Sequence, residues 1–189
     1  MAKIIYSMAG EGRGHAARVR STVEQLRNHQ VILLASGQAY DLLKNWYGKT
    51  DRFTIHQIPG LRFAYQKRRV AYVKSVCSSL PFLFRLSRHV ARIESFIQAE
   101  QPVLAISDFE PLLARAARRQ GVPLLSFDHQ HILTTCQFSH LPWRLRWKVA
   151  LIRLTIPFFG SGQRETLVSS FYHPPLVPRV SRVTQVGVM

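Results

Sequence analysis

Three glycines and a histidine form the stretch that decides the fold: Met8-Ala9-Gly10-Glu11-Gly12-Arg13-Gly14-His15. The apolar run before it, residues 3–7, predicts a buried strand, and residues 16–26 predict a helix. The glycines therefore lie on a strand-to-helix turn, where they permit a sharp bend and close approach of a ligand. Backbone amides at the start of the helix favour anions such as phosphate.

His15 stands at the start of that predicted helix. The positive end of the helix dipole disfavours a protonated imidazole at this place. A neutral histidine beside a phosphate pocket is a candidate general base. The alternative interpretation is a glycine turn needed only for topology, with His15 as an ordinary residue of the first turn.

The turn differs from two common nucleotide-binding motifs. Its glycines are spaced Gly10-x-Gly12-x-Gly14, and no acidic residue closes the second predicted strand, which ends Leu33-Leu34-Ala35-Ser36-Gly37. A dinucleotide site needs the spacing Gly-x-Gly-x-x-Gly and a carboxylate for the ribose. The phosphate-loop pattern GxxxxGK[ST] is absent as well. Neither kind of site is expected.

The composition indicates one folded domain over residues 1–189, with 47% hydrophobic residues. The two cysteines, Cys77 and Cys136, form no metal or redox motif, which predicts a reducing compartment and two buried thiols. No signal-peptide pattern follows Met1, and no uncharged apolar run approaches the roughly 20 residues of a membrane span. A cytoplasmic protein is therefore expected.

The charge is strongly basic, with 26 Lys and Arg against 10 Asp and Glu, a formal net charge of +16. Acidic residues are absent between Arg52 and Ile93 and again between His129 and Arg164. Such stretches attract nucleic acid, anionic lipid or phosphorylated ligands. The sequence contains no recognisable nucleic-acid module, so nucleic acid is not the expected partner. A solvated basic surface is the alternative.

Two basic segments suit an anionic membrane surface. One is a loop with Lys67, Arg68 and Arg69 at its tip. The other is the predicted helix over residues 141–159, where tryptophans and basic residues alternate: Trp143, Arg144, Trp147 and Lys148. This combination is typical of an interfacial helix and predicts peripheral binding at the inner face of the plasma membrane. An ordinary packing helix is the alternative.

Strands and helices alternate along the chain. Further strands are predicted at residues 30–34, 53–59, 103–106, 122–127, 166–171 and 183–188, and helices at 39–46, 70–100 and 112–120. Pro81 should start a new helix or kink the long one. The order predicts an α/β fold, a Rossmann-like doubly wound parallel sheet with helices on both faces. Right-handed crossovers then bring the glycine turn, Asp108 and residues 128–131 to one rim.

Polar residues follow two of these strands. Asp108 ends a central strand, where open α/β sheets place ligand contacts. Glu110 has capping-box spacing to Ser107 and is predicted to be structural. Asp128, His129 and His131 form a second polar cluster at the same edge. Their spacing is not diagnostic of a metal site, and no metal is expected.

Three segments resemble one family: Ile4-Ile5-Tyr6-Ser7-Met8-Ala9-Gly10-Glu11-Gly12-Arg13-Gly14-His15, Ile106-Ser107-Asp108-Phe109-Glu110-Pro111 and Gly121-Val122-Pro123-Leu124-Leu125-Ser126-Phe127-Asp128-His129-Gln130. They are similar to GT-B glycosyltransferases, and most similar to the branch of the peptidoglycan UDP-N-acetylglucosamine transferase, the plant galactolipid synthases and their uncharacterised bacterial relatives. The resemblance covers nearly the whole chain as an N-terminal half. The family's donor-binding signature has no counterpart in residues 1–189.

The resemblance implies the acceptor-binding half of an inverting glycosyltransferase. The donor would be a nucleotide-sugar, a UDP-sugar, and the acceptor a hydroxyl of a lipid or cell-envelope precursor. His15 matches the family's base and Asp108 is placed to support it, while the contacts to the acceptor or its phosphate are assigned to Gly10, Glu11, Gly12, Arg13, Gly14, Asp128, His129 and His131.

The partner implied is a C-terminal donor-binding domain, in cis or in trans, and the chain alone is expected to be inactive and to carry no cofactor. Two alternatives stay open: a non-catalytic basic module for anionic membrane or nucleic acid, and half of a sugar-nucleotide epimerase.

Overall fold

The computed structural model describes residues 1–11, 13–50, 52–61, 65–66, 69–70 and 72–188. Within these residues a seven-stranded sheet has the order β3-β2-β1-β6-β7-β8-β9, and each pairing in it is parallel. Its strands are β1 (Lys3–Met8), β2 (Gln30–Ala35), β3 (Phe53–Gln57), β6 (Leu104–Asp108), β7 (Leu124–Asp128), β8 (Glu165–Ser169) and β9 (Val183–Val186). The predicted doubly wound parallel sheet is confirmed.

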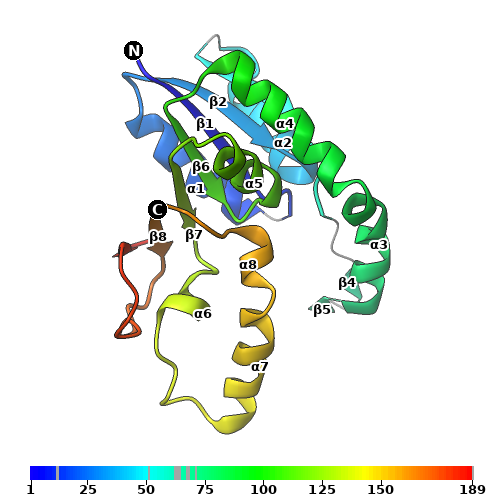
Figure 1. Cartoon of the computed structure of the whole chain (residues 1–189). Coiled ribbons are helices and arrows are strands. Elements are labelled where there is room, and N and C mark those ends of the chain that lie inside the picture. Colours follow the sequence, from blue (N-terminus) through cyan, green and yellow to red (C-terminus); the bar gives the residue numbers. More distant parts are fainter. Residues whose placement is uncertain (12, 51, 62–64, 67–68, 71, 189) are drawn as a thin grey trace.

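Helices cover both faces of the sheet (Figure 1). They are α1 (Arg13–Gln25), α2 (Gly37–Tyr47), α3 (Tyr72–Phe84), α4 (Leu86–Glu100), α5 (Pro111–Arg119), α6 (Ile132–Thr135), α7 (Trp143–Arg153) and α8 (Ile156–Phe159). Side chains of a strand point alternately to its two faces. Tyr6 accordingly packs in the core under α1 and α2, and Ile5 in the core under α4 and α5.

Helix boundaries differ from the sequence-based expectation in two places. Pro81 lies inside α3, and the break between α3 and α4 falls at Arg85. The helix expected over residues 141–159 is divided into α7 and α8, with Pro157 in the first turn of α8, a position that does not require its missing N–H.

Smaller corrections concern the basic loop and one cysteine. The loop contains a short antiparallel pair, β4 (Tyr65–Gln66) and β5 (Arg69–Val70). Cys136 is buried as expected, but Cys77 is exposed, so the prediction of two buried thiols is wrong. The buried positions of α3 include Ser75, Ser79 and Phe82, at helical spacing, and Cys77 lies off that face.

The strand order changes direction beside β1, because β2 pairs with one edge of β1 and β6 with the other. Ligands of open α/β sheets bind at such a switch point, outside the carboxyl ends of the strands. Met8 pairs with Asp108 in register, and the amide of Ala9 donates to the carbonyl of Asp108 at 2.9 Å. The glycine turn and Asp108 are therefore neighbours at this edge.

Candidate active site

Gly10 is required by the packing of the turn. A Cβ at Gly10 would lie 2.6 Å from the carbonyl oxygen of Ser36 and still closer to its Oγ, and a Cβ at Gly60 would lie 2.7 Å from the Cβ of Ser36. The amide of Ala39 also donates to the carbonyl of Gly10 at 3.3 Å. Position 10 therefore approaches Ser36, the N-cap residue of α2, closely.

The first turn of α1 is open to solvent. The helix begins at Arg13, three residues earlier than predicted, so that Gly14 and His15 are helical. Arg13 and Gly14 are exposed, and nothing lies within 4 Å of a Cβ built at Gly14. Glu11 is half-buried, and Gly12 lies outside the described residues. Packing does not require glycine at position 14, unlike position 10.

His15 and Asp108 are in direct contact. The Nδ1 of His15 lies 2.8 Å from Oδ1 of Asp108, with the His15 side chain 14% exposed and the Asp108 side chain fully buried. An ionised carboxylate only accepts hydrogen bonds, so Nδ1 carries the proton and donates it. In a neutral ring this leaves Nε2 with a free lone pair, the tautomer that a base needs.

Arg18 is the third member of the group formed with His15 and Asp108, and it was not among the residues predicted from the sequence. One terminal nitrogen of its guanidinium donates to both carboxylate oxygens of Asp108, and its side chain is 13% exposed. Arg18 follows His15 by three residues and therefore lies on the same side of α1. The spacing of these two residues indicates that they share one side of a helix, but it does not identify the partner of the arginine.

The electrostatics of Asp108 reflect these contacts. Burial raises the pKa of the Asp108 carboxyl above its ordinary value, while the hydrogen bond from His15 and the charges of His15 and Arg18 act to lower it. A buried carboxylate is tolerated when it is paired and hydrogen-bonded. Arg18 and His15 are these partners.

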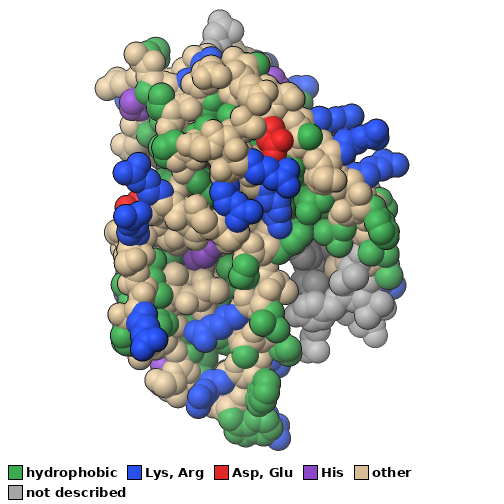
Figure 2. Space-filling view, viewed as in Figure 1, with side chains coloured by type: hydrophobic (Ala, Val, Ile, Leu, Met, Phe, Trp, Pro, Cys, Tyr) green, Lys and Arg blue, Asp and Glu red, His purple; other side chains and the backbone are tan. Residues whose placement is uncertain are grey.

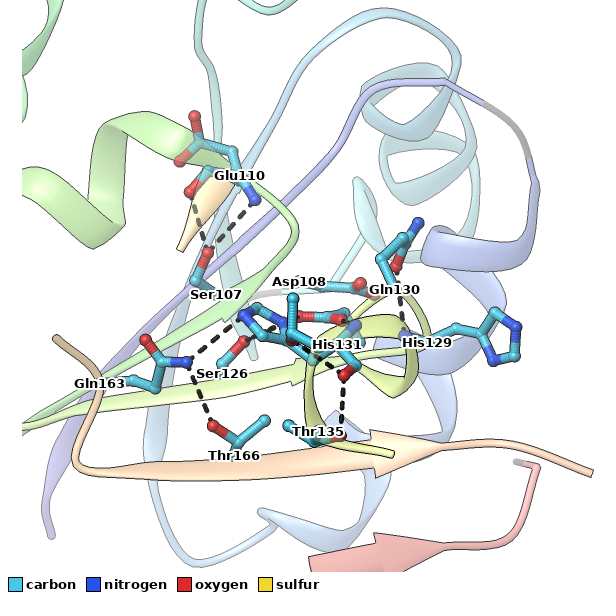
Figure 3. A network of polar contacts seen from close by, with 12 residues as sticks. Ser107, Asp108, Glu110, Ser126, His129, Gln130, His131, Thr135, Gln163 and Thr166 are labelled. Carbon is cyan, nitrogen blue, oxygen red and sulfur yellow. Dashed lines mark hydrogen bonds and ion pairs between the residues drawn. The ribbon is translucent and has the colours of Figure 1, made fainter. Parts of the chain in front are cut away.

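Asp128 and His131 form a separate buried pair at the end of β7. Their Oδ2 and Nδ1 atoms are 2.6 Å apart, the amide of His131 donates to Oδ1 at 2.8 Å, and Ser126 donates to Oδ2 at 2.7 Å. Figure 3 shows His131 beside Ser126 in this network. Burial, the largest effect, raises the pKa of Asp128, but these hydrogen bonds outweigh it, and the net pKa is lowered. Both side chains are buried, and the acceptor contact assigned to them stays a prediction.

His129 lies at the surface of the same edge. Its Nδ1 donates to the carbonyl of Ser169 at 2.8 Å, and the residue is exposed. His129 is therefore the member of the predicted polar cluster that a ligand can reach.

Glu110 has the structural role predicted for it, with a different geometry. It is the N-cap of α5, and its carboxylate accepts from the amides of Leu112 and Leu113, each at 2.8 Å. The hydroxyl of Ser107 donates to the carbonyl of Glu110 at 2.9 Å and accepts from its amide at 3.3 Å (Figure 3). Burial raises the pKa of Glu110 to about 7, against the opposing effect of the two amide hydrogen bonds.

The predicted membrane residues are divided between two places. Lys67 and Arg68 lie outside the described residues, and Arg69 belongs to β5. The other four are exposed on α7, with Trp143 and Trp147 each 65% exposed beside Arg144 and Lys148.

Within the described part of the chain, no group of three or more His, Cys, Asp or Glu side chains has an arrangement that could hold a metal ion. None of the helices in this part combines the length and apolarity needed to cross a membrane.

A model of one protein family, described as glycosyl transferase family 1, matches residues 2–186. The chain belongs to this family. No curated protein matches the chain.

Solved structures of glycosyltransferases share the fold of this family 1 domain. MurG of Acinetobacter baumannii matches at a TM-score of 0.56 and 16% identity, covering 97% of this chain and 44% of that one. A UDP-glucosyltransferase of Polygonum tinctorium matches at a TM-score of 0.59 and 12% identity, covering 98% and 51%. UGT89C1 of Arabidopsis thaliana, solved in complex with UDP-L-rhamnose, matches at a TM-score of 0.52 and 14% identity, covering 91% of this chain and 46% of that one.

The chain thus spans about half the length of these solved chains. Its fold is that of an N-terminal GT-B glycosyltransferase domain, as the resemblance in the sequence implied.

Proposed function

We propose that this chain is the acceptor-binding half of an inverting glycosyltransferase and that His15 is its base. The observation that carries the proposal is the contact between His15 and Asp108 at the carboxyl edge of β1 and β6. It joins a histidine with a free Nε2 to a buried carboxylate at the switch point of the sheet. The transferred sugar comes from a nucleotide-sugar, a UDP-sugar, and goes to a hydroxyl acceptor.

In this mechanism Nε2 of His15 takes the proton of the acceptor hydroxyl as its oxygen attacks the anomeric carbon. A new carbon–oxygen bond forms while the bond from the anomeric carbon to the diphosphate oxygen breaks, and the nucleoside diphosphate leaves with the electron pair. A single displacement from the opposite face inverts the anomeric centre. Asp108 stabilises the imidazolium that forms, and Arg18 holds the carboxylate in place.

The donor is assigned to a second domain, in the same polypeptide or in another. The support is the coverage of the solved glycosyltransferases, of which this chain matches about half. The acceptor side then comprises the exposed first turn of α1, with Arg13 and Gly14, and the exposed His129. The amides and the positive end of α1 suit a phosphate carried by the acceptor.

The test is the replacement of His15 by Ala in the enzyme that joins this chain to its donor-binding domain. General base catalysis supplies about 10²–10⁴-fold, so kcat should fall by that factor, with donor affinity unchanged. Asp108→Asn should cost less if the aspartate only orients and stabilises the ring. His173→Ala, a change at an exposed histidine beyond β8, is the control and should leave turnover intact. Wild-type turnover in His15→Ala would remove the proposal.

We further propose that the acceptor is a lipid or a cell-envelope precursor reached at an anionic membrane. The support is α7, which has no buried residue and exposes Trp143, Trp147 and Leu151 beside Arg144 and Lys148. Figure 2 shows hydrophobic and basic side chains mixed at the end of the molecule that carries α7. Aromatic and basic residues together suit the boundary between lipid headgroups and acyl chains.

A further inference from the structure

Phe109 has a backbone conformation that bulky side chains avoid. Its φ is 54°, in the left-handed region, and it lies between Asp108 and the N-cap residue Glu110. In the described residues, positive φ without glycine occurs also at Gln101 and Arg182, and Gln101 is the C-cap of α4, where this conformation is common. Strain of this kind persists only where the surroundings determine it, and it collects at functional sites.

The backbone on both sides of Phe109 is fixed. The carbonyl of Asp108 accepts from Ala9, so the end of β6 is fastened to the glycine turn. Two hydrogen bonds join Ser107 to the backbone of Glu110, and the Glu110 carboxylate caps α5. The strained residue is thus held between the strand that carries Asp108 and the helix that follows it.

The ring of Phe109 is held from a distant part of the chain. It stacks on the ring of Phe159, the last residue of α8, with centroids 3.9 Å apart and planes 13° from parallel. The neighbouring Phe158 is tied to α5, because Arg115 donates to its carbonyl at 2.5 Å and lies over its ring at 4.4 Å. The end of α8 is therefore anchored on α5, and Phe159 presents a fixed surface to Phe109.

We infer that Phe109 is a positioning residue for the His15–Asp108 pair and that Phe159 locks it. This inference rests on the proposed function. Relaxation of Phe109 to a common negative φ would turn the peptide group that joins it to Asp108 and strain the hydrogen bonds of Ser107 and Glu110. The stack prevents this rotation and keeps the Asp108 carboxylate directed at Nδ1 of His15. It also connects the α7–α8 segment to the base, since α8 directly follows α7.

The experiment is nitrogen and proton NMR of the His15 ring in this chain at a fixed pH of about 7.5. In the wild type the ring should show protonated Nδ1 with a downfield, exchange-protected proton. Phe159→Leu keeps an apolar side chain and removes the flat ring, and it should abolish that proton signal and mix the two ring tautomers. Glycine adopts a positive φ without strain, so Phe109→Gly removes the tendency to relax and should restore the wild-type signal in the Phe159→Leu background.

Phe171→Leu is the matched control, the same change at a phenylalanine that is 90% exposed and lies outside α8. It should leave the His15 signal unchanged. If Phe159→Leu keeps the wild-type signal, if Phe109→Gly fails to restore it in the Phe159→Leu background, or if Phe171→Leu loses it equally, the positioning role is wrong. This result is independent of turnover, so it is distinct from a failure of His15 as base.

In the assembled enzyme, Phe159→Leu should lower kcat by about 10- to 100-fold with little change in the KM for the donor, as expected when a catalytic group is displaced. An equal loss in Phe171→Leu would contradict the lock.

Discussion

Arg18 donates from a single guanidinium nitrogen to both carboxylate oxygens of Asp108, at 2.7 Å each. The aspartate is therefore shared between an arginine and a histidine that stand one helical turn apart. Arg18 balances the negative charge while His15 is neutral. When His15 takes a proton, the group has one positive charge in excess. The arginine therefore keeps the buried carboxylate compensated in both protonation states of His15.

Replacing Arg18 by Met should leave the buried Asp108 carboxylate without its permanent cation. Removal of one partner of a buried ion pair costs about 3–5 kcal/mol, and we expect a loss of that order in urea unfolding. Because a protonated aspartate needs no cation, the loss should shrink as the pH falls. The double variant with Asp108→Asn should recover part of the stability. Equal stability of Arg18→Met and the wild type at neutral pH would show that the pair contributes nothing.

Gly10 and Gly14 should respond in opposite ways to alanine. Gly10→Ala places a Cβ against the backbone of Ser36 and should lower the melting temperature markedly. Gly14→Ala meets open space and, as a helical position, should leave stability unchanged or slightly raised. If a ligand approaches the first turn of α1, Gly14→Ala should still weaken acceptor binding. Calorimetry measures the effect on stability, and the KM for the acceptor measures the effect on binding. A lower melting temperature in Gly14→Ala would contradict the prediction for this position.

Glu110 should make stability depend on pH. Its pKa in the folded chain is about 7, above the ordinary value of 4.5, so the folded state holds this proton more tightly. The resulting stability is fully present below pH 4.5 and is lost as the pH rises through 7. At about 1.4 kcal/mol per pKa unit, the loss amounts to roughly 3 kcal/mol.

Glu110→Gln removes the titration and should flatten this part of the pH profile, even if the weaker cap lowers the stability at every pH. Glu165→Gln, at an exposed residue of β8, serves as the control and should keep the wild-type slope. Parallel profiles for the wild type and Glu110→Gln between pH 4.5 and 8 would contradict the prediction.

The α7 surface should bind anionic vesicles, with binding that falls steeply as salt rises. Each basic residue near such a surface contributes about 1 kcal/mol, screened by salt. The double variant Arg144→Gln, Lys148→Gln should reduce the part of the vesicle binding that depends on salt. The double variant Trp143→Ser, Trp147→Ser should reduce the part of the binding that remains in high salt. Phe171→Ser is the control, since Phe171 is 90% exposed but lies outside α7. Equal binding to neutral vesicles, or tighter binding to DNA, would contradict the membrane proposal.

The alternation of strands and helices was enough to predict the sheet and to bring the glycine turn and Asp108 to one edge. Parallel strands leave few ways to arrange such an order. The contact of His15 with Asp108 follows from that topology. Arg18 escaped prediction because a basic residue on an amphipathic helix usually faces solvent, and only the tertiary structure supplies its carboxylate.

The backbone conformation at Phe109 and the packing at Gly10 could not be predicted from the sequence for another reason. Local backbone preference argues against a positive φ at a phenylalanine, so the sequence does not predict the conformation of Phe109. The tertiary contact with the ring of Phe159 is needed to explain it. Likewise, the glycine at position 10 is explained by Ser36, a residue on the next strand-to-helix connection. In the polar cluster, Asp128 and His131 were expected at the edge of the sheet, and the sequence could not show that they are buried there and hydrogen-bonded to each other.

His15 and Asp108 are 93 residues apart in the chain, although they touch in the fold. During synthesis β2, which pairs with one edge of β1, and β3, which pairs with β2, precede β6. The other edge of β1 gains its neighbour only after α3 and α4 have been made. For that interval one edge of β1 has unpaired backbone groups, the kind of edge that recruits foreign strands. The step that covers this edge is the same step that brings His15 its carboxylate, so a nascent chain protected against misassociation has also formed the proposed catalytic pair.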